Sequence, residues 1–164
     1  MGKTGRAQAS RASFAQAVAA DKGCAKGWYR LGNASHAAGE LVLALQHYER
    51  AAARSPDTPV FHFNCAVARR QLNRCEDARR RYQRVIALDP AHAAAHYNLG
   101  NLWRAAYRSA EAVPCYERAL ALRPLHEESY LNLAAALGEC GRLAEVAALH
   151  ASAGQSRPAC APAG

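Results

Sequence analysis

Apolar and small residues recur along this chain at a fixed spacing of 34 residues. The phrase "YERAAARSP" at 48–56 returns as "YQRVIALDP" at 82–90 and as "YERALALRP" at 116–124. Each copy runs from a tyrosine to a proline, which lacks a backbone N–H and disfavours helix in the residue before it. The pattern therefore predicts a repeated structural unit in which a helix ends at each proline.

Numbering the unit from Ala25 as position 1 shows that the register continues to Pro158 without an insertion. In the first unit, the large residues at positions 4, 7 and 24 and the small ones at positions 8, 20 and 27 are Trp28, Leu31, Tyr48, Gly32, Ala44 and Ala51. Small residues let helix axes approach closely, and large residues fill the gaps between helices. The spacing is therefore that of closely packed helices.

The order W-x-x-L-G, then A, Y, A and P at these spacings, resembles the tetratricopeptide repeat family across residues 25–158. The resemblance implies an all-α fold, a right-handed superhelical solenoid of antiparallel helix pairs. Four full repeats are expected, at 25–58, 59–92, 93–126 and 127–158. Residues 8–24 match only a second helix and are expected to form an N-terminal half repeat, so that the solenoid spans 8–158. Residues 1–7 and 159–164 are expected to be disordered.

Position 15 of each unit is where the first helix should end. Gly39 and Gly141 suit the left-handed conformation that ends many helices, and Asn73 can adopt it. Tyr107 adopts it poorly, and we expect a distorted turn in the third repeat.

Composition narrows the possible functions only slightly. The chain has 164 residues and a formal net charge of +8, which favours anionic partners in general. No run of eighteen apolar residues is present, so no membrane span is expected. The six cysteines lack the paired spacing of a metal site and are interpreted as reduced thiols, which is typical of a cytoplasmic protein.

The resemblance implies that the first helix of each repeat lines a concave groove. The residues expected to form a peptide-binding groove are Lys26, Tyr29, Arg30, Asn33, Phe63, Asn64, Arg70, Tyr97, Asn98, Asn101, Arg104 and Asn132. The aromatic side chains would hold apolar groups of a ligand. The row Asn64, Asn98 and Asn132 could bind a peptide main chain, since an amide side chain both donates and accepts. The basic residues would favour an acidic ligand, although Glu128 and Glu139 make the far end acidic.

This row of asparagines resembles the ladder of O-linked N-acetylglucosamine transferases, whose "NLG" asparagines hold extended peptides. "HYNLGN" and "YLNLAA" match well, "FHFNCA" matches less well, and Arg30 departs from the pattern. The carboxylate clamp of chaperone-binding relatives is not expected, because its basic positions fall on Tyr29, Ala94 and Asn98. Tyrosine and asparagine at these positions can also serve helix packing alone.

The prediction is a non-enzymatic scaffold that binds an extended, acidic peptide and needs no cofactor or metal. One alternative is the recognition module of a larger enzyme, such as a glycosyltransferase. Another is an adaptor that self-associates through its ends, where Phe14 and Val18 are expected to be exposed. Residues 68–84 hold seven arginines, but they have too few interleaved aromatic residues to favour nucleic acid. "MGKTG" lacks the rest of a phosphate-binding loop.

Overall fold

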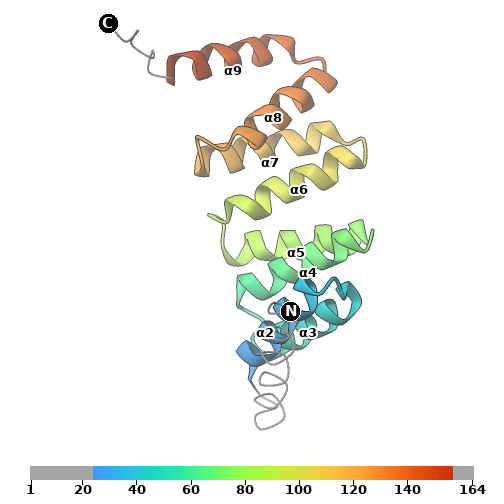
Figure 1. The fold of residues 1–164 in the computed structure, drawn as a ribbon. Helices are drawn as coiled ribbons and strands as arrows, with labels where there is room; N and C mark the ends of the chain where they lie inside the picture. The colour runs from blue at the N-terminus through green and yellow to red at the C-terminus, as the bar shows by residue number, and fades with distance from the viewer. Residues whose placement is uncertain (1–23, 157–164) are drawn as a thin grey trace, which may run out of the picture. The chain divides into compact units, whose positions relative to one another are not determined.

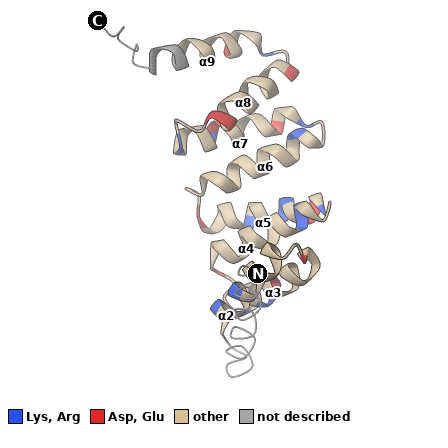
Figure 2. Ribbon diagram, in the orientation of Figure 1, with Lys and Arg blue, Asp and Glu red and all other residues tan. Residues whose placement is uncertain are grey.

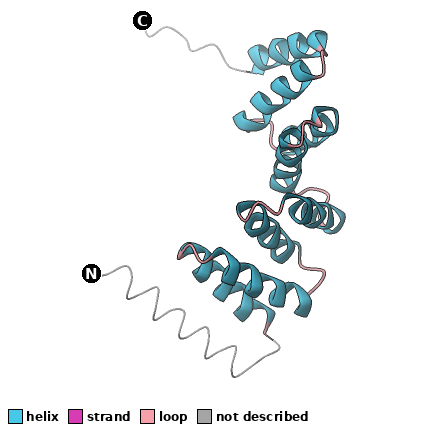
Figure 3. Cartoon of the chain, turned by 90° about the vertical axis from the view of Figure 1, so that its right-hand side faces the viewer, coloured by secondary structure: helices cyan, strands magenta, loops and turns pink. Residues whose placement is uncertain are grey.

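The computed structural model describes residues 24–156, and the side chains of residues 24–151. Within this range the chain forms eight helices joined by short loops, and it has no strand (Figure 1, Figure 3). The prediction of an all-α helical repeat fold is therefore confirmed. The predicted half repeat, up to residue 23, and the predicted disordered ends lie outside the described residues.

The eight described helices follow one another along the chain as four pairs, one pair for each predicted full repeat. The first four are α2 (Ala25–Ala37), α3 (Leu41–Arg54), α4 (Pro59–Gln71) and α5 (Cys75–Leu88). The next four are α6 (Ala93–Ala105), α7 (Ser109–Leu122), α8 (Glu127–Glu139) and α9 (Leu143–Ser156). The starts of α2, α4, α6 and α8 follow the period of the sequence. The chain divides into two compact units, residues 1–95 and 96–164, which are described one at a time below.

Proline ends the second helix of the first three pairs as the sequence predicts. The residue before each proline is extended, with φ of −141° at Ser55, −140° at Asp89 and −138° at Arg123. Each of these residues still donates its backbone N–H to the carbonyl four residues earlier, at 2.8–3.0 Å. The helix therefore closes its last turn and then stops, because the proline ring disfavours helical backbone just before it.

The turn at position 15 has the same backbone geometry in all four pairs. Gly39 and Gly141 have φ of +78° and +73°, and Asn73 and Tyr107 both have φ of +59°. The N–H of Tyr107 donates to the carbonyl of Arg104 at 2.9 Å, as the N–H of Gly39 does to that of His36 at 3.0 Å. The expected distortion at Tyr107 is wrong: the hydrogen bonds of the turn hold the tyrosine in the left-handed region.

In the first and third pairs, close approach of the two helices depends on glycine at position 8. A Cβ atom on Gly32 would lie 2.5 Å from the ring of Tyr48, and one on Gly100 would lie 2.7 Å from the ring of Tyr116. Both tyrosines are buried, in the cores of the first and second units respectively. The small residue thus makes room for an aromatic side chain that joins the two helices of a pair.

Candidate functional site

In the first unit, a side-chain contact links the first helices of successive repeats. Nδ2 of Asn64 on α4 donates to the hydroxyl of Tyr29 on α2 at 3.3 Å and to the carbonyl of Val60 at 3.0 Å. Both side chains remain partly exposed. Because the amide nitrogen is held by these two acceptors, the amide oxygen of Asn64 is oriented and can accept a hydrogen bond from a ligand.

The second unit contains the equivalent contact. Nδ2 of Asn132 on α8 donates to the hydroxyl of Tyr97 on α6 at 3.4 Å and to Oδ1 of Asn101 at 3.1 Å. Oδ1 of Asn132 accepts from the guanidinium of Arg104 at 3.4 Å. Four of the predicted groove residues therefore meet in one polar cluster. Asn98, also predicted, lies partly buried on α6.

The asparagines at position 9 contact the helix pair to which they belong. The hydroxyl of Tyr48 donates to Oδ1 of Asn33 at 2.9 Å, and that of Tyr116 donates to Oδ1 of Asn101 at 2.8 Å. Burial raises the pKa of both tyrosines to about 12. Asn33 and Asn101 thus hold buried hydroxyls, and their role toward a peptide stays a prediction.

The predicted row of aromatic side chains is packed against other rings. The ring centroid of Phe63 lies 5.7 Å from that of Tyr82 and 4.8 Å from that of His92. The Tyr97 ring lies 5.0 Å from that of His126. His92 and His126 also cap the following helices, accepting from the backbone N–H three residues later at 3.2 Å. The aromatic side chains are therefore held in defined orientations while part of each stays exposed.

The predicted basic residues are of two kinds. Lys26, Arg30 and Arg70 are exposed in the first unit. In the second unit, Nε of Arg104 donates to a carboxylate oxygen of Glu139 at 2.9 Å. Hydrogen bonds from the Ser109 hydroxyl and from Arg104 lower the pKa of Glu139. Arg104 is thus already paired with a carboxylate, and an acidic ligand would have to compete for it.

The arginine-rich segment 68–84 includes most of α5, where Figure 2 shows blue basic positions beside red acidic ones, and five of its seven arginines form ion pairs. The pairs are Arg69–Glu49, Arg74–Asp77, Arg79–Glu76, Arg80–Asp77 and Arg84–Asp57. Nη1 of Arg81 donates to Nδ1 of His62 at 3.0 Å. These pairs reduce the positive charge that the segment could offer to a polyanion.

Glu139 as a partner of Arg104, and the histidine caps, were missed by the sequence reasoning. The pairing of Arg104 with Glu139 follows a regular spacing, because four side-chain contacts between successive repeats join residues that are 35 positions apart. These are His36–Gln71, Tyr29–Asn64, Tyr97–Asn132 and Arg104–Glu139. A search at one residue more than the repeat length would have found all four.

The described residues contain neither a candidate metal site nor a candidate membrane span. Within residues 24–156, no group of three or more His, Cys, Asp or Glu side chains is arranged to hold a metal ion. None of the described helices has the length and apolarity that a membrane span needs.

Comparison with known proteins agrees with this architecture. The family model described as "Tetratricopeptide repeat" matches residues 2–59 and 66–124. Comparison with curated protein sequences gives no significant match. The crystal structure of MamA superposes with a TM-score of 0.82 at 18% identity, covering 89% of this chain and 85% of that chain.

Two further solved structures are similar. YrrB, described as "a TPR protein with an unusual peptide-binding site", gives a TM-score of 0.78 at 19% identity, covering 88% of this chain and 75% of that chain. The first TPR of Spaghetti (RPAP3), bound to the HSP90 peptide SRMEEVD, gives 0.69 at 25% identity, covering 71% and 93% respectively.

Proposed function

Because the chain belongs to the tetratricopeptide repeat family, we propose that it is a non-enzymatic scaffold that binds an extended peptide along the first helices of its repeats. The contact between Asn64 and Tyr29 carries this proposal. It orients the amide group of the partly exposed Asn64 next to the ring of the partly exposed Tyr29. Such a pair can accept a main-chain N–H and contact an apolar side chain of one ligand residue.

The second unit supports the same function with a parallel arrangement. Asn132 and Tyr97 repeat the contact at the equivalent positions. Solved structures of similar fold include one described by its peptide-binding site and one with a bound peptide. Asn98, which is partly buried on α6 of the second unit, is also part of the proposed site.

We propose an acidic ligand mainly for the first unit. Lys26, Arg30 and Arg70 are exposed there. The peptide bound to the Spaghetti TPR domain, SRMEEVD, has three acidic residues. In the second unit the charge of Arg104 is already balanced by Glu139. Acidic residues of a ligand are therefore expected toward the first unit.

The proposal is tested with an array of ten-residue peptides, in acidic form and with Gln and Asn in place of Glu and Asp. Peptides bound by wild type are then titrated against Asn64→Ala and Asn132→Ala. Each lost hydrogen bond should weaken binding by roughly 2- to 10-fold. Gln83→Ala, which removes an exposed amide from α5, is the control and should bind as wild type does.

Two results would count against the proposal in different ways. Unchanged affinity in both asparagine variants would show that the peptide does not bind along the first helices of the repeats. Equal binding of acidic and amidated peptides would remove the charge preference and leave the site in place. A pull-down with the Asn64/Asn98/Asn132→Ala triple variant beside wild type would then identify the natural ligand.

A further inference from the structure

The fourth helix pair departs from the packing rule of the other three. In those pairs, positions 20 and 24 hold a buried alanine and a buried tyrosine: Ala44 and Tyr48, Ala78 and Tyr82, Ala112 and Tyr116. On α9 the same positions are Val146, which is partly buried, and His150, which is exposed. Nδ1 of His150 forms a hydrogen bond with the hydroxyl of Tyr130 at 2.5 Å. Because no buried aromatic ring joins α8 to α9, this pair is packed less tightly.

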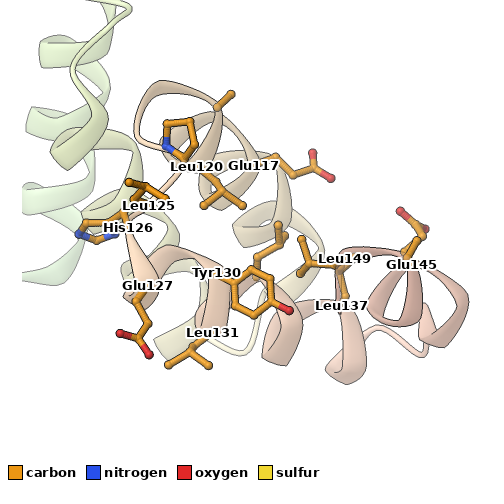
Figure 4. Close-up of a pocket in the computed structure, with 14 residues that line it drawn as sticks. Glu117, Leu120, Leu125, His126, Glu127, Tyr130, Leu131, Leu137, Glu145 and Leu149 are labelled. Atoms are coloured by element: carbon orange, nitrogen blue, oxygen red, sulfur yellow. The ribbon is translucent and has the colours of Figure 1, made fainter. Parts of the chain in front are cut away.

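A cleft of about 960 Å³ opens in this part of the second unit, between α7, α8 and α9 (Figure 4). Its apolar lining includes Leu120, Leu125, Tyr130, Leu131, Leu137 and Leu149. Leu125 and Leu131 are 92% and 55% exposed. Their burial by a ligand would remove apolar surface from water, which is favourable.

Leu125 is a large apolar residue at a turn position where the two preceding repeats have a polar or a small residue. It follows the proline that ends α7, and the equivalent residues after α3 and α5 are Asp57 and Ala91. A turn residue that is almost fully exposed contributes little to the fold, so a leucine there has no structural explanation within the described residues. A role in contacting a ligand explains it.

The charge at the cleft is opposite to that of the whole chain. Glu117, Glu127 and Glu145 line it, and no lysine or arginine does. Glu145 is paired with Arg142 at 2.7 Å, and the charge of Arg142 also acts on Glu117, whereas Glu127 forms no ion pair within residues 24–151. Figure 4 shows the Glu127 carboxylate on one side of the cleft and those of Glu117 and Glu145 on the other. An occupant with cations on both flanks would satisfy them.

We propose that this cleft is a second protein-binding site, which takes a short apolar segment of a partner flanked by lysine or arginine. Charge complementarity selects this ligand, because the charged residues that line the cleft are all glutamates, although the chain as a whole carries +8. Its ligand is opposite in charge to the one proposed for Asn64 and Tyr29. The protein could therefore hold two partners, or two segments of one partner, at the same time.

The test titrates the full chain with a labelled fourteen-residue helical peptide that has leucine on one face and lysine elsewhere. A peptide with glutamate in place of every lysine is the matched probe. The lysine peptide should bind saturably and the glutamate peptide should not. Glu117→Lys/Glu127→Lys and Leu125→Ser should each weaken binding about tenfold or more. Glu76→Lys in the first unit and Leu143→Ser outside the cleft should leave it unchanged.

Three results would overturn the proposal. One is equal binding of the two peptides, and another is an unchanged affinity in both cleft variants. The third is a wild-type dimer in sedimentation that Leu125→Ser dissociates, without binding of the lysine peptide, which would assign the cleft to a second copy of the chain. Asn64→Ala should not alter binding of the lysine peptide, so failure here is distinguishable from failure of the first proposal.

Discussion

The hydroxyl of Tyr48 donates to the amide oxygen of Asn33 across the first helix pair, at 2.9 Å. The third repeat has the same bond between Tyr116 and Asn101. The second repeat has Val67 in place of the asparagine, and the buried hydroxyl of Tyr82 has no hydrogen-bond acceptor. Arg70 lies near this hydroxyl and lowers its pKa, although burial has the larger, opposite effect. A guanidinium can only donate, so Arg70 cannot accept the hydrogen of the hydroxyl.

This difference predicts opposite effects of the same substitution. Tyr48→Phe and Tyr116→Phe should each lower the free energy of unfolding by about 0.5–1.5 kcal/mol, because each removes a buried hydrogen bond. Tyr82→Phe should leave it unchanged or raise it, since the hydroxyl is buried without an acceptor. Urea denaturation followed by circular dichroism measures all three.

Val67→Asn should supply the missing acceptor and stabilise the protein by about 1 kcal/mol. The gain should disappear when Val67→Asn is combined with Tyr82→Phe. An equal loss of stability in all three tyrosine variants would contradict this account.

Tyr107 should be replaceable with a gain in stability. Its φ of +59° costs an L-residue roughly 1–2 kcal/mol, and its side chain is 97% exposed. Tyr107→Gly should therefore raise the free energy of unfolding by about 1 kcal/mol. Gly39→Ala is the converse control, because the space around Gly39 is open and only the backbone conformation opposes a side chain there. It should destabilise by a similar amount.

Pro114 is expected to weaken α7. It lies inside the helix with an exposed ring, and it cannot donate to the carbonyl of Ala110 four residues earlier. Pro114→Ala should raise the free energy of unfolding by about 1–3 kcal/mol. Pro59, at the first position of α4, lacks only an N–H that would have no partner in the helix, so Pro59→Ala should change stability little. Equal effects of the two substitutions would contradict the explanation.

His62 should make stability depend on pH. Arg81 can only donate to its Nδ1, and the carbonyl of Pro56 can only accept from its Nε2 at 2.7 Å, so the imidazole is neutral. Burial lowers its pKa, and the charges of Arg81 and Arg84 add to this shift, although Pro56 and Asp57 oppose it. The unfolded chain therefore binds a proton more readily than the folded one.

The resulting contribution is present above the unfolded pKa of about 6.5 and is lost as the pH falls below it. The free energy of unfolding should decrease from about pH 7 to about pH 5. His62→Gln, which can still donate to the Pro56 carbonyl, should show a smaller decrease over the same range. The same slope in both proteins would show that other groups cause the effect.

Much of the local structure follows from the sequence. The prolines and the position 15 residues act on their own backbone, so the ends of the helices could be read from the 34-residue period. The close approach of Gly32 to Tyr48, and of Gly100 to Tyr116, likewise follows from the sequence pattern, which places a small residue at position 8 and a large one at position 24. Tyr107 is the exception, because the hydrogen bonds of its turn outweigh its own preference.

The side-chain partners were decided only by the tertiary structure. Arg104 and Asn101 were predicted from their helix positions to line a groove, and this stays a prediction. The structure adds their partners within the chain: Arg104 pairs with Glu139 and Asn101 accepts from Tyr116. A repeat pattern indicates which face of a helix a residue occupies. It does not indicate which side chain of the neighbouring helix contacts that residue, because the contact depends on the offset and separation of the two helix axes. The cleft beside Leu125 has the same origin: Val146 and His150 fit the period, but their size and polarity decide how closely α9 packs on α8.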